Sequence, residues 1–88
     1  MPKDDVKNIV IGYIRNRFMI GRSMDTMTES DSLLEKGILD STGMLELVGF
    51  LEETFGVKVE DDELIPENLD SMSNIVAFVL RKKEIATL

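Results

Sequence analysis

The segment from Ser41 to Phe55 repeats apolar residues at the spacing of an amphipathic α-helix. When successive residues are turned by about 100°, one arc of this helix holds Met44, Leu47, Val48, Leu51 and Phe55. The opposite arc holds Glu46, Gly49 and Glu53. Because an apolar arc of this kind must be covered by other parts of the chain, the segment predicts a packed helical core.

Two other segments have the same period and can supply the covering helices. The first follows Lys3, is expected to end at Gly21, and has as its apolar residues Val6, Ile9, Val10, Tyr13 and Ile14. The last follows Asp70 or Ser71, either of which can cap it, and has as its apolar residues Met72, Ile75, Val76, Val79 and Leu80. Strand signals are limited to a brief alternation at residues 57–59. The sequence therefore predicts one all-α domain over residues 1–88, a small bundle of three main helices plus one short helix.

The connections between these helices differ in length. Residues 22–40 show no sustained period and are rich in Thr, Ser, Asp and Glu, which predicts a long loop between the first and second helices. Four apolar residues are expected to hold the second half of this loop against the core, around a helical turn at "SLLEK": Leu33, Leu34, Ile38 and Leu39. The stretch "VEDDELIP" is expected to form the short helix and to stop before Pro66, since proline disrupts a continuing helix.

Composition excludes several functions. The chain has 88 residues, of which 43% are apolar, so it can build one modest core with little room for an enclosed active site. With 10 Lys and Arg against 17 Asp and Glu, the net charge of -7 would repel nucleic acid and favours basic protein partners. The absence of cysteine excludes disulfides and thiolate metal sites. No apolar run is long enough to span a membrane, and we expect a cytoplasmic protein.

Ser41 lies after Asp40 at the start of the central helix, and two roles are open to it. Its hydroxyl can cap the helix, although Asp40 could cap equally well. Alternatively, the free N–H groups and positive dipole end of a helix N-terminus favour a phosphodiester on this serine, and Gly37 and Gly43 would leave its hydroxyl accessible. A catalytic serine is disfavoured, because a serine nucleophile usually needs an adjacent histidine as its base and the chain contains no histidine.

The outer surface near Ser41 presents an apolar residue framed by carboxylates. Leu45 lies off the core arc beside Gly49 and Glu52, and Phe50 lies on the other flank. This surface is either a solvated face with a single exposed leucine or a docking surface for a partner.

The central segment resembles the acyl carrier proteins. The matching pattern is D-S-x-x-x-x-E-L-V-x-x-L-E-E-x-F-G, which runs without a break from Asp40 to Gly56. The likeness extends over nearly the whole chain, because the order of a first helix, a long loop, an acidic helix, a short helix and a last helix after "LDSMSNIV" is also that of the family.

The resemblance implies a role for each matching residue. In the family the serine after the aspartate is esterified by 4'-phosphopantetheine from coenzyme A, and this role falls on Ser41, with Asp40 helping to position the modifying enzyme and its metal. The positions that match partner-facing residues are Leu45, Glu46, Gly49, Glu52 and Glu53. The apolar arc of the central helix, with Ile75, Val76 and Val79, would line the space in which some carriers shelter an acyl chain.

The resemblance also implies partners. They are a phosphopantetheinyl transferase, an adenylating ligase or acyltransferase that loads the cargo, and a downstream synthase or transferase; the carrier itself is expected to be a monomer without a catalytic role. Thr42 and Gly43 depart from the commonest fatty-acid carrier signature, and "ILDSTG" with "NIV" is closer to D-alanyl carriers and other free-standing carriers. Gly49 replaces a bulkier residue common in fatty-acid carriers.

Two competing functions come from other classes. An unmodified acidic helical adaptor would use the same outer face to bind a basic protein, and Ser41 would then only cap the helix. A calcium-binding helix pair is disfavoured, because "DSTGMLELVGFLEE" and "EDDELIPENLDS" both lack the ligand spacing of a calcium loop.

Overall fold

The three predicted main helices are all present. The computed structural model describes residues 3–19 and 28–86, and the predicted stop at Gly21 lies outside them. The helices are α1 (Lys3–Phe18), α2 (Ser41–Phe55), α3 (Pro66–Leu69) and α4 (Met72–Ala86), with a 3₁₀ turn at Asp61–Glu63. The described ranges contain no strand, so the all-α prediction is confirmed.

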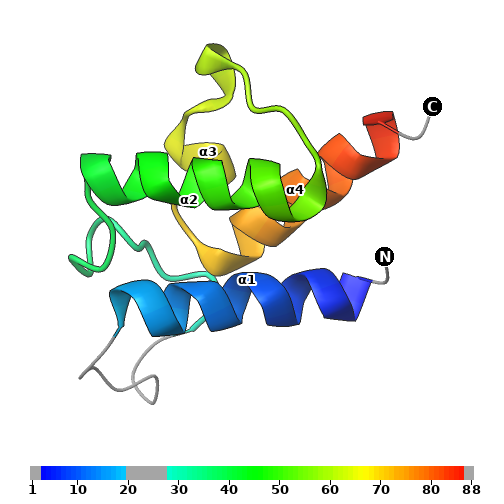
Figure 1. The fold of residues 1–88 in the computed structure, drawn as a ribbon. Helices are drawn as coiled ribbons and strands as arrows, with labels where there is room; N and C mark the ends of the chain where they lie inside the picture. Colours follow the sequence, from blue (N-terminus) through cyan, green and yellow to red (C-terminus); the bar gives the residue numbers. More distant parts are fainter. Residues whose placement is uncertain (1–2, 20–27, 87–88) are drawn as a thin grey trace.

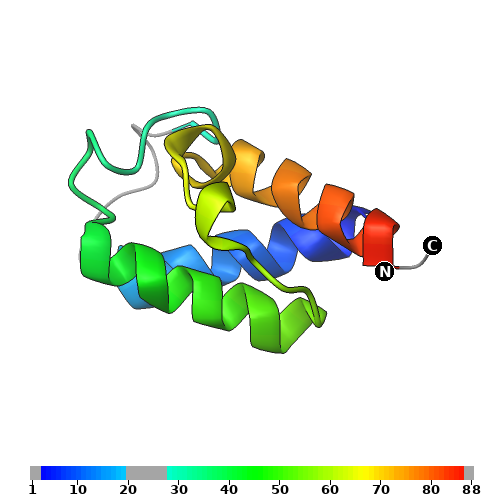
Figure 2. The same ribbon diagram turned by 90° about the horizontal axis from the view of Figure 1, so that it is seen from above.

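The helices enclose one apolar core. α1 and α2 run antiparallel, so that the start of α2 lies beside the end of α1, and α4 lies behind them (Figure 1; Figure 2). Fully buried side chains come from every main helix: Val6, Val10, Ile14, Leu47, Leu51, Ile75 and Val79. In the described part of the chain, no helix is both long and apolar enough to cross a membrane.

The loop before α2 is held against the core as expected, with one correction. Leu33, Ile38 and Leu39 are buried, whereas Leu34 is 40% exposed and its predicted burial is wrong. The predicted helical turn forms, because the Lys36 N–H donates to the Ser32 carbonyl at 3.1 Å. Within that turn, adjacent residues point in different directions, so only one of the two leucines faces inward.

The sequence left open whether Asp70 or Ser71 caps the last helix, and in the structure the two residues have different roles. The Ser71 hydroxyl accepts the Asn74 N–H at 3.1 Å and so caps α4. The Asp70 carboxylate accepts instead from the Ser32 hydroxyl at 2.5 Å and from the Leu34 N–H at 2.8 Å, which ties the loop to the α3–α4 junction. The predicted apolar stripe of α4 is buried at Met72, Ile75, Val76 and Val79, and Phe78 is a further core residue.

The segment between α2 and α4 corrects the prediction of one short helix ending before Pro66. A 3₁₀ turn forms at Asp61–Glu63, and Pro66 begins α3. Proline fits the first turn of a helix, because its fixed φ is helical and no N–H is required there. At the 3₁₀ turn, the Glu63 carboxylate accepts the Glu60 N–H and the Lys82 ammonium, each at 2.8 Å.

This carboxylate makes stability depend on pH. The hydrogen bonds from Lys82 and from the Glu60 N–H lower the pKa of Glu63 below its ordinary value of 4.5. A carboxyl whose pKa is lower in the folded state stabilises the fold above its unfolded pKa, and this contribution is lost as the pH falls through the folded value. We therefore expect Glu63→Gln to flatten the loss of thermal stability below about pH 4.5, measured by circular dichroism. Glu67→Gln, at an exposed position, is the control, and equal acid slopes for wild type and Glu63→Gln would contradict the assignment.

Candidate functional site

The N-terminus of α2 is capped by Asp40 and not by Ser41. Asp40 has extended backbone angles, and its carboxylate accepts the Gly43 N–H at 2.7 Å. Ser41 is the first residue of the helix and is exposed. The interpretation of Ser41 as the helix cap is therefore wrong, and its hydroxyl makes no hydrogen bond to another described residue.

Two backbone donors remain open beside that hydroxyl. The Met44 N–H donates to the Asp40 carbonyl and the Gly43 N–H is capped, whereas the N–H groups of Ser41 and Thr42 have no acceptor among the described residues. Ser41 and Thr42 are both exposed. Open N–H groups at the positive end of a helix dipole suit an anionic phosphodiester, so the donor set of this end fits such a group.

Gly43 is a packing residue and is not part of the exposed surface around the Ser41 hydroxyl. It is buried, and a Cβ atom there would lie 3.1 Å from a ring carbon of Phe18 and 3.3 Å from Leu39. The glycine therefore lets the end of α1 approach the start of α2. Gly37, the other glycine predicted to expose the hydroxyl, is itself exposed and has a left-handed φ of 71°.

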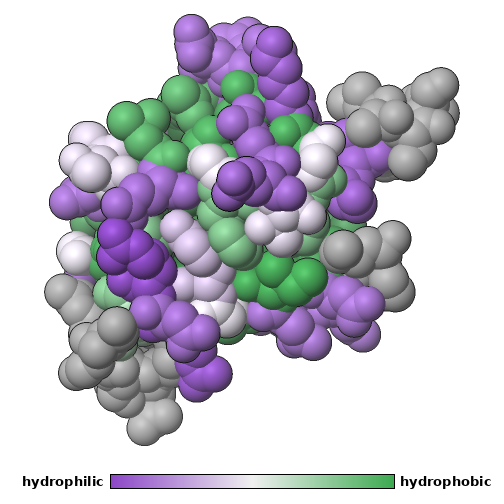
Figure 3. Space-filling view, in the orientation of Figure 1, coloured by the Kyte–Doolittle hydropathy of each residue, from purple (hydrophilic) through white to green (hydrophobic). Residues whose placement is uncertain are grey.

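The predicted partner-facing residues share the outer face of α2, but their carboxylates are not equally free. Leu45 is 64% exposed, and Gly49 is also exposed. Glu46 forms an ion pair of 2.7 Å with Arg17 of α1. The Glu52 carboxylate accepts the Val59 N–H at 2.9 Å. Glu53 is exposed and has no partner in the described part of the chain. Figure 3 shows hydrophilic and hydrophobic side chains interspersed on this side of the molecule.

Several known proteins similar to this chain are carrier proteins, and no family model matches the sequence. The D-alanyl carrier protein of Streptococcus suis (strain 98HAH33) is 33% identical over 76 residues, which cover 86% of this chain and 92% of the relative. The acyl carrier protein of Lactobacillus johnsonii is 30% identical over 79 residues, which cover 90% of this chain and 94% of the relative. The chain belongs to the acyl carrier protein family.

Solved structures agree with this assignment of the fold. The acyl carrier protein of Thermotoga maritima superposes with a TM-score of 0.69 at 21% identity, over 96% of this chain and 93% of that one. A chain in a crystal structure described as an FAD-dependent dehydrogenase superposes with a TM-score of 0.68 at 30% identity, over 80% of this chain and 97% of that one. The protein is thus an acyl or aminoacyl carrier, of a family whose members generally bear phosphopantetheine and interact with partner enzymes.

Sequence reasoning missed an aromatic contact next to the acidic face of the carrier. The rings of Tyr13 in α1 and Phe50 in α2 stack with centroids 3.8 Å apart. Partial burial raises the pKa of Tyr13, the Glu46 carboxylate raises it further, and Arg17 lowers it. The only signal in the sequence was that Phe50 falls off the core arc, and that signal does not reveal which residue of another helix covers it.

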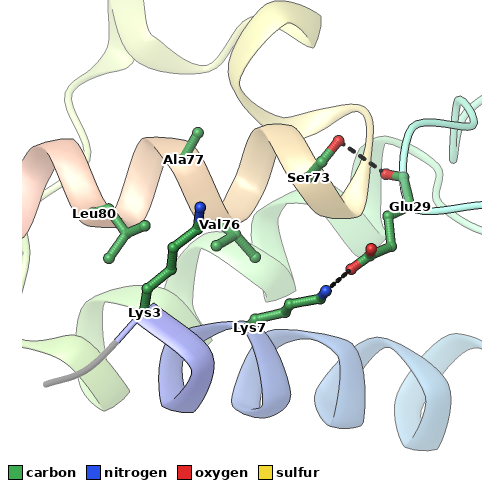
Figure 4. Close-up of a pocket in the computed structure, with 7 residues that line it drawn as sticks. All are labelled: Lys3, Lys7, Glu29, Ser73, Val76, Ala77 and Leu80. Carbon is green, nitrogen blue, oxygen red and sulfur yellow. Dashed lines mark hydrogen bonds and ion pairs between the residues drawn. The ribbon is translucent and has the colours of Figure 1, made fainter.

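A concavity lies between α1 and α4 of the carrier. It has a volume of about 300 Å³, with Val76, Ala77 and Leu80 on one side and two lysines on the other (Figure 4). Lys7 forms an ion pair of 3.1 Å with Glu29, whose carbonyl also accepts the Ser73 hydroxyl at 3.1 Å. These contacts attach the loop to both helices. Of the α4 residues predicted to line a space for an acyl chain, Val76 lines this concavity.

Proposed function

We propose that Ser41 of this carrier is the attachment point of a 4'-phosphopantetheine arm. The observation that carries the proposal is that Asp40, and not Ser41, caps α2, so that Ser41 is exposed at the start of the helix. When bound, the group supplies the terminal thiol on which acyl or aminoacyl cargo is held as a thioester. That thiol would account for a carrier whose own chain has no cysteine.

The residues around Ser41 would hold the phosphodiester and orient the modifying enzyme. The open N–H groups of Ser41 and Thr42 can donate to phosphate oxygens at the positive end of the α2 dipole. The Asp40 carboxylate is fixed by its bond to the Gly43 N–H, so it presents a carboxylate in a defined position beside the serine. In this proposal Asp40 helps to position a phosphopantetheinyl transferase and its metal.

Loading and unloading would be carried out by other enzymes. We infer an adenylating ligase or acyltransferase as the loading enzyme and a synthase or transferase as the downstream enzyme. Each enzyme would bind the outer face of α2. The carrier itself would be a cytoplasmic monomer with one domain over residues 1–88. The likeness to a D-alanyl carrier protein supports an aminoacyl cargo. The likeness to a chain from an FAD-dependent dehydrogenase structure adds a flavin-dependent dehydrogenase to the candidate downstream enzymes.

The proposal is tested by intact-protein mass spectrometry. The apo-protein is incubated with coenzyme A and a permissive phosphopantetheinyl transferase, and a mass gain of one phosphopantetheine is expected, with the modified peptide containing Ser41. If a folded sample that was not already modified gained no mass, the proposal would fail, and an unmodified acidic adaptor would become the better account of the outer face.

Glu53 should contribute most to encounter with basic enzymes, because it is the carboxylate of this face without an internal partner in the described residues. We expect Glu53→Lys to slow loading about two- to tenfold at low salt, and added salt to reduce the difference. The measurement is the initial rate of phosphopantetheine transfer at several salt concentrations. Glu67→Lys, the same change at an exposed position on α3, is the control; equal slowing by both variants would show that only net charge matters.

A further inference from the structure

A groove with an aromatic floor lies between α1 and α2. Its floor is the stack of Tyr13 and Phe50, whose ring planes are 10° apart. The edges of this stack meet Phe18 and Phe55, at centroid distances of 5.7 and 6.5 Å. The groove has a volume of about 570 Å³ and is also lined by Arg17, Glu46, Gly49, Glu52 and Glu53.

Gly49 leaves this floor uncovered. A Cβ atom at position 49 would meet no atom within 4 Å, and the residue does not have a positive φ. Neither packing nor backbone conformation therefore requires glycine there, in the interior of a helix where glycine is less favourable than alanine. The effect of the glycine is that no side chain at position 49 occupies the groove.

Arg17 shows which chemical group such a site accepts. Its guanidinium lies 5.4 Å from the centroid of the Phe18 ring and pairs with Glu46 at 2.7 Å. A planar guanidinium can stack on an aromatic ring and donate to a carboxylate at the same time, which the compact ammonium of lysine does less well. The groove also offers an aromatic surface and a carboxylate at a second place, in the Tyr13–Phe50 stack and in Glu53. Glu53 has no partner in the described ranges.

We propose that this groove receives one arginine side chain of a partner enzyme, with the guanidinium on the Tyr13–Phe50 stack and bonded to Glu53. The occupant is chosen by charge complementarity and by the arrangement that Arg17 already displays. Docking therefore involves α1 as well as α2 and distinguishes arginine from lysine. The inference rests on the proposed function only in assigning the arginine to an enzyme that loads or unloads the carrier.

The binding site itself can be tested without any enzyme. The probe is N-acetylarginine amide, compared with N-acetyllysine amide and with the uncharged N-acetylcitrulline amide, by amide chemical shifts and tyrosine emission. Tyr13 is the single tyrosine and the chain has no tryptophan, so its emission reports on the groove. We expect saturable shifts at Gly49 and Phe50 with the arginine probe, about two- to fivefold weaker binding of the lysine probe, and no binding of citrulline.

Two matched pairs of variants complete the test. Gly49→Gln should fill the groove and weaken the arginine probe about two- to fivefold or more while raising the melting temperature. Gly12→Gln, at a helical glycine that also has open space and does not line the groove, should raise the melting temperature and leave binding unchanged. Glu53→Gln should weaken binding, and Glu67→Gln should not.

The opposite results would overturn the inference. The inference would be wrong if the arginine and lysine probes bound equally well, or if Gly49→Gln bound the arginine probe as well as the wild type. It would also be wrong if the probe shifted the amide signals of all acidic residues and not those beside the groove. The same titration on Ser41→Ala separates the two proposals, because that variant cannot be modified but keeps the groove. If the wild type binds the probe but gains no mass, the arginine site is supported and phosphopantetheine attachment is refuted. If it gains mass but does not bind the probe, attachment is supported and the arginine site is refuted.

Discussion

Replacing Ser41 with alanine is expected to abolish phosphopantetheine attachment while changing the free energy of unfolding by no more than about 0.5 kcal/mol. The large functional effect follows because no other hydroxyl can take the place of Ser41 directly after the capping aspartate. The small structural effect follows because the bond that caps α2 comes from Asp40, and the Ser41 side chain is exposed. The measurements are intact mass after incubation with coenzyme A and transferase, and urea unfolding of the same sample.

Asp40 supplies the control that separates capping from modification. Asp40→Ala removes the bond to the Gly43 N–H and should cost about 0.5–2 kcal/mol of stability. Asp40→Asn keeps a side-chain oxygen for that bond and should keep most of the stability, but it lacks the charge proposed to position the transferase. Normal attachment to Asp40→Asn would show that the charge is not needed. Attachment to Ser41→Ala at the wild-type rate would place the modification elsewhere and refute the assignment of Ser41.

Local patterns predicted the parts of the site that depend on a single helix. The range of α2 was correct at both ends, because its apolar period begins after Asp40 and stops before Gly56, which has the left-handed φ of 67° typical of a helix end. The exposure of Leu45 follows from the same period. Which of Asp40 and Ser41 caps the helix was not decided by sequence, since both residue types cap well and the choice depends on where the first helical turn begins.

Contacts between side chains of different helices could not be predicted from the apolar period of each helix. Glu46 is neutralised by Arg17 and Phe50 is stacked on Tyr13, pairs that are far apart in the sequence and meet only because α1 and α2 pack antiparallel. Periodicity identifies which face of a helix is outward, but it does not say which outward side chains of two helices meet. The acidic face expected from the sequence is therefore less charged than its composition suggests, and the aromatic groove beside it emerges only from the packing.

Leu33→Ala is expected to have the largest effect on stability, a loss of about 2–5 kcal/mol. Leu33 is fully buried, and its backbone joins two parts of the fold: its N–H donates to the Asp70 carbonyl at 2.7 Å, and its carbonyl accepts the N–H groups of Ile38 and Leu39 at 3.0 and 3.2 Å. Removing the side chain would leave a cavity beneath the residues that lead directly into Asp40 and Ser41. Because domains of this size are stable by only about 5–15 kcal/mol, the variant should unfold at much lower urea concentration.

Leu34→Ala is the matched control, since it makes the same change one residue farther along the same turn. Leu34 is 40% exposed, so the loss should be about 1 kcal/mol or less. Equal losses for the two variants would mean that the loop is not anchored by the inward leucine. A large loss for Leu33→Ala alone, accompanied by slower attachment to the residual folded protein, would show that the anchor of the loop also fixes the geometry at the start of α2. The modification site would then depend on a buried residue in the loop as well as on the helix that carries the serine.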